Sequence, residues 1–337
     1  MAGDASMRAM RSLAATLAWI AALCGALVLG APPAAAQGYP AKPVHMIVGF
    51  PPGGGTDILA RLLAQRLSEA WGQSVVVENR PGASATIAAN AVAHAAPDGY
   101  TIEMGQLTPN AIAPALYGNL TYDAVKDFTP IVLVGTSPNV LVVTPTLPAR
   151  TVAELVTRAK EGGKPLTYAS SGPGSLQHIA AELFRSMAGV PLLHVPYKGS
   201  SQAVIDVIAG QVDMNFDSIP ATAQQIKAGK LRAIAVTGAR RAGGGLEDVP
   251  TIAESGFPGY DLTTWWGLFA PAGTPPAVVK RIRDDTVAIL KLPEVRERFA
   301  GVGVEPGGGS SEEFAAYVRQ EIVKYDKLVK QLDIKLE

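Results

Sequence analysis

Apolar residues in the first third of the chain alternate between short runs and helically spaced stripes. A short apolar run at 44–50, bounded by prolines, predicts a buried strand. Between 58 and 71 the apolar residues recur at helical spacing, which predicts a helix that buries one face. Short runs at 75–78 and 100–104 predict two further strands, separated by an alanine-rich helix that ends near His94.

The same order of elements returns later in the chain. Runs at 166–169, 192–195 and 212–216 predict strands, and the segments 176–187 and 203–209 predict helices. Alternating strands and helices favour mostly parallel sheets with helices on both faces, and two such units favour two lobes. The predicted fold is therefore α/β.

Two extended apolar segments, 140–144 and 263–269, are expected to cross between the lobes. From Pro275 onward helical periodicity resumes, with a break at the three glycines 307–309. The predicted domains follow from these crossings. Lobe 1 comprises 37–139 and 264–337, and lobe 2 comprises 140–263.

The first residues predict a secretory signal peptide over 1–36. Arg8 and Arg11 precede an apolar run, and three alanines before Gln37 supply the small residues of a cleavage site. Cleavage between Ala36 and Gln37 would release the protein through the inner membrane into the periplasm.

The only cysteine, Cys24, lies in this segment, so the processed chain would hold no thiol and no disulfide. The sequence leaves open whether translation starts at Met1, Met7 or Met10.

Composition and charge exclude several function classes. The 337 residues are 48% hydrophobic and carry a formal net charge of zero, which argues against the basic surface that nucleic-acid binding needs. Gly53 and Gly55 fit part of the dinucleotide fingerprint, but its third glycine is replaced by Ile58. The four histidines lie on separate elements without metal-ligand spacing. We therefore expect no cofactor and no metal.

Glycine-rich loops come directly before helices in both halves of the chain. The first is VGFPPGGGTDILARLL at 48–63, and the second lies at 170–175. Glycines let an anion approach the free N–H groups of a helix N-terminus. Short hydroxyl side chains nearby add donors for a carboxylate, namely Thr56, Ser84, Ser171 and Ser175. A tight turn without a ligand is the alternative for any one of these loops.

Other residues in these loops admit two interpretations. Asp57 contacts a ligand or interacts locally with its own helix N-terminus. Ser175 and His178, three residues apart, form a hydrolytic pair or serve hydrogen bonding and packing. Trp265 and Trp266 pack between the lobes or stack on a ligand.

Five blocks of sequence carry a resemblance to a known family. They are FPPGGGTD at 50–57, ENRPGA at 78–83, PDGYT at 97–101, VPYKG at 195–199 and PTIAE at 250–254. These blocks, in this order, resemble the Bug family of TctC-like extracytoplasmic solute receptors, which serve tripartite tricarboxylate transporters. The resemblance extends over the chain from about residue 40 onward.

The resemblance implies a two-lobed, type II-like periplasmic binding protein with its ligand cleft between the lobes. Such a receptor captures a small carboxylated solute and delivers it to the membrane permease subunits of the transporter. It is not an enzyme, and we expect a monomer. The solute could be a dicarboxylate, a tricarboxylate, an acidic amino acid or an aromatic acid.

Carried onto this chain, the resemblance assigns ligand-binding residues to loops of both lobes. They are Phe50, Gly53, Gly54, Gly55, Thr56, Asp57, Ser84, Ala85, Ser171, Gly172, Ser175, His178 and Asp217. The chain departs from the family at 83–86, Ala-Ser-Ala-Thr, where more glycine is usual; the variable end of the solute is expected to lie there.

Two other functions stay open at this point. A secreted hydrolase would use Ser175 and His178, and a receptor could present its solute to a sensor protein instead of a permease. The sequence does not name the solute, the permease, or the choice between transport and signalling.

Overall fold

The computed structural model describes residues 38–335. Every element described below lies in one compact unit, which begins at Pro40. The expected signal peptide at 1–36 falls outside the described residues.

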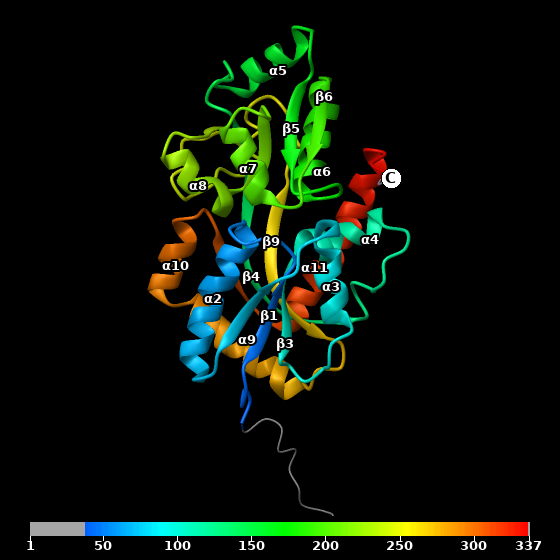
Figure 1. The fold of residues 1–337 in the computed structure, drawn as a ribbon, viewed down its shortest axis with the longest axis vertical. Coiled ribbons are helices and arrows are strands. Elements are labelled where there is room, and N and C mark those ends of the chain that lie inside the picture. Colours follow the sequence, from blue (N-terminus) through cyan, green and yellow to red (C-terminus); the bar gives the residue numbers. More distant parts are fainter. Residues whose placement is uncertain (1–37, 336–337) are drawn as a thin grey trace, which may run out of the picture. The chain divides into compact units, whose positions relative to one another are not determined.

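Strands and helices alternate along this unit (Figure 1). The strands are β1 Val44–Val48, β2 Val75–Asn79, β3 Thr101–Gln106, β4 Phe128–Val143, β5 Leu166–Ser170, β6 Leu192–Pro196, β7 Met214–Ser218, β8 Arg232–Val236, β9 Thr263–Pro271 and β10 Glu305–Gly308. The helices are α2 Gly55–Trp71, α3 Thr86–Ala93, α4 Ala113–Leu116, α5 Val152–Lys160, α6 Leu176–Ala188, α7 Ser200–Ile208, α8 Ile219–Lys227, α9 Pro276–Leu290, α10 Pro293–Ala300 and α11 Ser311–Gln331, with short helical turns η1 Ala83–Ala85 and η2 Thr108–Ile112.

The strands pair in the order β2-β1-β3-β9-β4-β7-β5-β6, with β10 and β8 also paired to β4. β4 changes partners along its length, because its residues 128–138 pair with β9 and its residues 139–143 pair with β7 and β8. We call β1, β2, β3, β9, β10 and residues 128–138 the β1 half. The β5 half comprises β5 to β8 and residues 139–143. In Figure 1 helices α5 to α8 surround the β5 half, and α2, α3, α9 and α11 flank the β1 half.

Each predicted strand and helix is present, but the sheets are mixed rather than mostly parallel. β1 pairs in parallel with β2 and β3, and β5 pairs in parallel with β6 and β7. β4 and β9, in contrast, run antiparallel to their neighbours. The predicted crossing segment 140–144 overlaps the end of β4, which is a strand of 16 residues. β4 continues through the polar residues 136–139 because neighbouring strands pair with it there. The glycine break at 307–309 overlaps a short strand, β10, which pairs with β4.

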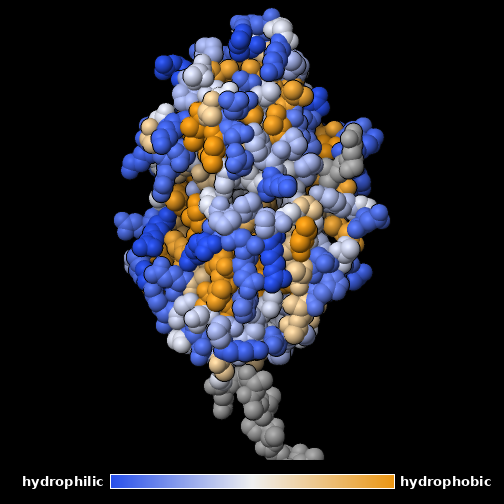
Figure 2. All heavy atoms as spheres, viewed as in Figure 1, coloured by the Kyte–Doolittle hydropathy of each residue, from blue (hydrophilic) through white to orange (hydrophobic). Residues whose placement is uncertain are grey.

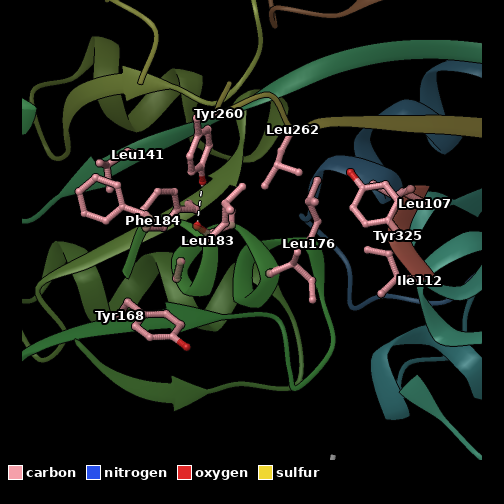
Figure 3. Close-up of a cluster of buried hydrophobic side chains, with 14 of the residues drawn as sticks. Leu107, Ile112, Leu141, Tyr168, Leu176, Leu183, Phe184, Tyr260, Leu262 and Tyr325 are labelled. Carbon is pink, nitrogen blue, oxygen red and sulfur yellow. Dashed lines mark hydrogen bonds between the residues drawn. The ribbon is translucent and has the colours of Figure 1, made fainter. Parts of the chain in front are cut away.

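Apolar packing is continuous across the two halves. Figure 3 shows Leu176 and Leu262 lying between Phe184, on α6, and Tyr325, on α11. All four side chains are at most 3% exposed. Burying such side chains contributes about 1.5 to 3 kcal/mol each relative to leaving them in water, so this cluster stabilises the position of α6 against the crossing strands.

The visible face of the protein is mainly hydrophilic, with apolar residues in separate patches (Figure 2). Within residues 38–335, none of the helices combines the length and the apolar character needed to span a bilayer.

Candidate functional site

A cavity of about 30 Å³ lies where β1, β3, β5 and β7 reach their carboxyl ends. In open α/β sheets this is the edge at which ligands bind. The cavity is lined by Phe50, Gly54, Gly55, Thr56, Gln106, Asn139, Ser171, Leu176, Gln177, Ser200, Asp217, Ser218, Thr264 and Trp266. Both halves of the sheet therefore contribute to one small site.

A larger groove of about 1250 Å³ lies between α8, the loop 238–247 and the α10–β10 region. Charged residues of both signs line it, and the predicted ligand-binding residues lie elsewhere. We take the smaller cavity as the candidate site because the glycine loops converge on it.

Four helices begin at this cavity. The first residues of α2, α6 and α7, which are Gly55, Leu176 and Ser200, line it, and so does Ser218, which directly precedes α8. The first N–H groups of a helix have no partner within the helix, and the helix dipole adds partial positive charge there. Among the lining residues only Asp217 has a charged side chain. The cavity thus offers an anion neutral donors and helix dipoles instead of lysine or arginine.

The loop before α2 is organised by the carboxylate of Asp57. This carboxylate accepts hydrogen bonds from the Gly53 N–H at 2.9 Å, the Asn79 amide at 2.9 Å and the Arg61 guanidinium at 3.0 Å. Burial acts to raise the pKa of Asp57, but these donors hold it below its ordinary value. Asp57 and Gly53 therefore shape the loop, and they are not among the residues that line the cavity.

Thr56 and Trp266 join α2 to the crossing strand β9. The indole N–H of Trp266 donates to Thr56 Oγ1 at 3.0 Å, and both side chains are buried. Since that bond uses the oxygen as an acceptor, the Thr56 O–H can donate to a second group. Trp266 thus orients a hydroxyl at the cavity.

Asp217 is buried at the end of β7 and is surrounded by donors. It accepts from Gln177 Nε2 at 3.0 Å, Asn215 Nδ2 at 2.9 Å and the Ser218 N–H at 2.7 Å, and also from Ser200 Oγ. Burial raises the pKa of Asp217, against the opposing effect of these hydrogen bonds. Because a carboxylate has about four acceptor positions, Asp217 is occupied in fixing its neighbours.

The loop at 83–86 adopts a conformation that glycine would favour. Ala83, Ser84 and Ala85 have φ values of 44°, 51° and 75°. The left-handed region costs a residue with a Cβ roughly 1 to 2 kcal/mol. Ala83, Ser84 and Ala85, which stand where the family usually has more glycine, therefore hold a glycine-like backbone conformation at a cost in strain. Ser84 Oγ donates to the Pro173 carbonyl at 2.7 Å and so ties this loop to the β5 half.

The second glycine loop is held by Gln177, which the sequence did not single out. The Gln177 side-chain oxygen accepts from the Ser171 N–H at 3.2 Å and from Ser171 Oγ, while its amide donates to Asp217. Gly172, with a φ of 129°, lies close to Ser84 Oγ, since a Cβ there would be 3.1 Å from that atom.

Ser175 caps the start of α6, and the ring of His178 stacks on another histidine. Ser175 is the N-cap of α6, and its Oγ accepts from the His178 backbone N–H at 3.4 Å. The His178 Nδ1 accepts from the Gly174 N–H at 3.1 Å. Its ring stacks on His194 with centroids 4.3 Å apart. Neither Ser175 nor His178 lines the cavity.

His194 predicts a measurable pH dependence. Burial and the neighbouring His178 lower the pKa of His194 to about 4, so the unfolded chain takes up the proton first as pH falls from 6.5 toward 4. Stability is full above 6.5 and decreases through that window. The wild type should lose free energy of unfolding when the pH falls from 7.5 to 5. We expect this loss to be smaller in His194→Phe by about 1 to 2 kcal/mol, allowing for the partial exposure of the ring. Urea unfolding at both pH values measures it.

The exposed Leu193, next to His194 on β6, provides the control for this experiment. Leu193→Phe adds a ring without removing an ionisable group and should leave the dependence of unfolding free energy on pH as in the wild type. If the unfolding free energies of His194→Phe and of the wild type depended equally on pH, the assignment of the low pKa to the stacked His194 ring would be contradicted.

The structure brings some of the expected residues to the cavity and places others behind it. Lining residues are Phe50, Gly54, Gly55, Thr56, Ser171 and Asp217. Supporting positions in the surrounding loops and helices are taken by Gly53, Asp57, Ser84, Ala85, Gly172, Ser175 and His178. The lining residues that the sequence did not indicate as ligand-binding are Gln106, Asn139, Leu176, Gln177, Ser200, Ser218 and Thr264; Trp266 also lines the cavity and was expected there only as one of two alternatives. Thr264 and Trp266 belong to the segment 263–269, whose predicted crossing between the lobes could have indicated a position near the ligand cleft.

Comparison with known proteins places the chain in one family. The model of the TctC family, the tripartite tricarboxylate transporter family receptor, matches residues 59–334. Protein BugT of Bordetella pertussis is 35% identical over 308 residues, which cover 91% of this chain and 94% of BugT. The UPF0065 protein in the tcbD-tcbE intergenic region of Pseudomonas sp. strain P51 is 40% identical over 292 residues, 86% of each chain.

Solved structures of the same kind superpose over most of the chain. R. palustris Rpa4515 with adipate has a TM-score of 0.86 at 40% identity and covers 88% of this chain and 99% of its own. The periplasmic binding protein BugD has a TM-score of 0.84 at 35% identity, with 89% and 100% covered. MatC from Rhodopseudomonas palustris with bound malate has a TM-score of 0.82 at 32% identity, with 86% and 100% covered.

These matches agree with the receptor interpretation and exclude the hydrolase alternative, because the family and its solved members bind solutes. The chain belongs to the TctC family of periplasmic solute-binding receptors that serve tripartite tricarboxylate transporters.

Proposed function

We propose that this protein binds a small dicarboxylate in the cavity and delivers it to the membrane permease subunits of a tripartite tricarboxylate transporter. The observation that carries this proposal is the convergence of four helix N-termini on a cavity whose lining holds no lysine or arginine among the described residues. Such a site binds an anion through N–H and O–H donors. The relatives Rpa4515 and MatC, described with adipate and malate, support a dicarboxylate.

One solute carboxylate lies, in this proposal, at the start of α2. Its donors are the N–H groups of Gly55 and Thr56 and the Thr56 hydroxyl, from two residues that line the cavity. Phe50 and Gly54 complete its wall. Asp217 acts indirectly by orienting Ser200 and Gln177.

The solute enters when the two halves separate. A cavity of about 30 Å³ holds about one water molecule, so in this proposal the halves must move apart to accommodate a dicarboxylate. Ser201 Oγ donates to the Pro52 carbonyl at 2.7 Å, and this contact between the halves would break on opening. We propose lobes at 37–139 with 264–337, and at 140–263, because these boundaries lie within one residue of the point where β4 changes partner, between residues 138 and 139.

We also propose that the chain is exported as a precursor and acts as a monomer in the periplasm. Mass spectrometry of the periplasmic protein should give an N-terminus at Gln37, and light scattering should give the mass of one chain. An uncleaved N-terminus or a stable dimer would contradict these two points.

A solute panel tests the proposed function. The processed protein, freed of any bound solute by reversible unfolding, is screened by thermal shift against mono-, di- and tricarboxylates, acidic amino acids and aromatic acids. A dicarboxylate at 100 times its Kd should stabilise the folded state by about 2.7 kcal/mol. The solute should be recovered chemically unchanged. Stabilisation by neutral amides or cations instead of carboxylates would overturn the proposal.

A further inference from the structure

Two buried oxygen atoms in the lining of the cavity have no hydrogen-bond partner among the described residues. They are Asn139 Oδ1 and Thr264 Oγ1. Their side chains are 3% and 2% exposed. Buried polar atoms in folded proteins are nearly always paired, so two unpaired atoms in one cavity point to a group that arrives from outside the chain.

The orientation of the Asn139 amide is set by the surrounding backbone. Its Nδ2 donates to the Phe216 carbonyl at 2.8 Å, and its backbone N–H donates to Thr237 Oγ1 at 2.8 Å. Exchanging the amide nitrogen and oxygen would bring two oxygens together at Phe216. Oδ1 is therefore the free end of the amide, and it can only accept a hydrogen bond.

The strand register places the two atoms on the same face. Thr264 pairs with Ser137 across β4 and β9, and Asn139 lies two residues beyond Ser137. Residues two apart on a strand point to the same side, so Asn139 and Thr264 are diagonal neighbours. Diagonal side chains in antiparallel strands are close enough for one small group to contact both.

We propose that Asn139 and Thr264 form a subsite for a hydroxyl group carried by the solute carbon chain. This rests on the proposed function and names its solutes more closely, as hydroxy-substituted dicarboxylates. A hydroxyl both donates and accepts, so it donates to Asn139 Oδ1 and accepts from the Thr264 O–H. An ammonium group fits less well because Asp217, the only charged residue in the lining, already receives four hydrogen bonds.

The test compares dicarboxylates that differ by a single hydroxyl. Calorimetry gives Kd values for succinate against malate and for glutarate against 2-hydroxyglutarate. We expect the wild type to bind the hydroxylated member about 10-fold more tightly, since its absence leaves two buried groups unpaired. Thr264→Val, which keeps the side-chain shape, should reduce that preference to about 3-fold or less. Thr264→Ser keeps the hydroxyl and should retain the preference.

Thr263→Val on the neighbouring position of the same strand is the matched control and should keep the wild-type ratio. Equal affinities for both members of each pair in the wild type would overturn the subsite while leaving carboxylate binding intact; a bridging water would then satisfy the two atoms. Absence of binding for every dicarboxylate would overturn the proposed function and the subsite with it.

Discussion

Gly199→Ala should weaken solute binding about 10- to 100-fold without unfolding the protein. A Cβ at position 199 would lie 2.5 Å from Pro51 Cδ and 2.7 Å from Pro51 Cγ, across the contact between the β5 half and the β1 half. The proline ring is rigid, and forcing extra atoms into such a contact costs about 1 to 3 kcal/mol. Gly199 has an extended φ of 166°, which alanine also adopts, so its own half should fold normally.

Calorimetric titration with the best solute of the panel measures the loss, and thermal unfolding without solute checks the fold. Pro51→Ala removes the ring atoms and should restore most of the affinity in the double variant. Gly118→Ala, at a position with no atom within 4 Å of an added Cβ, serves as the unaffected control. Wild-type affinity in Gly199→Ala would mean that the Pro51 contact is absent from the solute-bound form.

Glu103→Gln should change the free energy of unfolding more favourably at pH 8 than at pH 5. The difference between its effects at the two pH values should be about 2 to 3 kcal/mol. Glu103 is 1% exposed on β3. Burial raises its pKa to about 7, against the hydrogen bond from Asn110 Nδ2. Because the folded pKa lies above the unfolded value, this residue contributes full stability below about pH 4.5, and that contribution is lost as pH rises through 7. Glutamine removes the ionisation and retains an oxygen for Asn110.

Urea unfolding of both proteins at pH 5, 6, 7 and 8 provides the measurement. The difference between variant and wild type cancels the titration of all other groups, so it should grow with pH. A constant difference would show that Glu103 ionises normally in the folded protein. The effect bears on the site because Asn110 Oδ1 also accepts from the N–H of Gln106, a lining residue.

The repeated order of strand, glycine loop and helix could be predicted because it depends on neighbours in sequence. A stripe of apolar residues at helical spacing predicts α2 and α6 whatever they pack against. Gly54 and Ser175, in the positions that precede these helices, are caps for the same local reason. The glycine loops, and with them the lining residues Gly55, Thr56 and Ser171, followed from that pattern.

The roles of individual residues within these loops were harder to predict. Asp57 and His178 were expected at the ligand as well as in local roles, and each is held by local partners behind the cavity. Arg61 lies one turn after Asp57 on α2 and is a local donor, whereas Asn79 belongs to β2 and local sequence carries no information on that contact. The position of His178 likewise depends in part on His194, which belongs to a separate strand.

The floor of the cavity was decided by tertiary structure. Asn139 and Thr264 are 125 positions apart in the chain, and they share a face only because β9 pairs antiparallel with β4 next to the point where β4 passes from one half to the other. Short-range periodicity reports which residues are buried, but it carries no record of register between distant strands. Sequence pattern therefore determines the glycine loops and helix starts that line one side of the cavity, whereas strand pairing determines which side chains of β4 and β9 line the other.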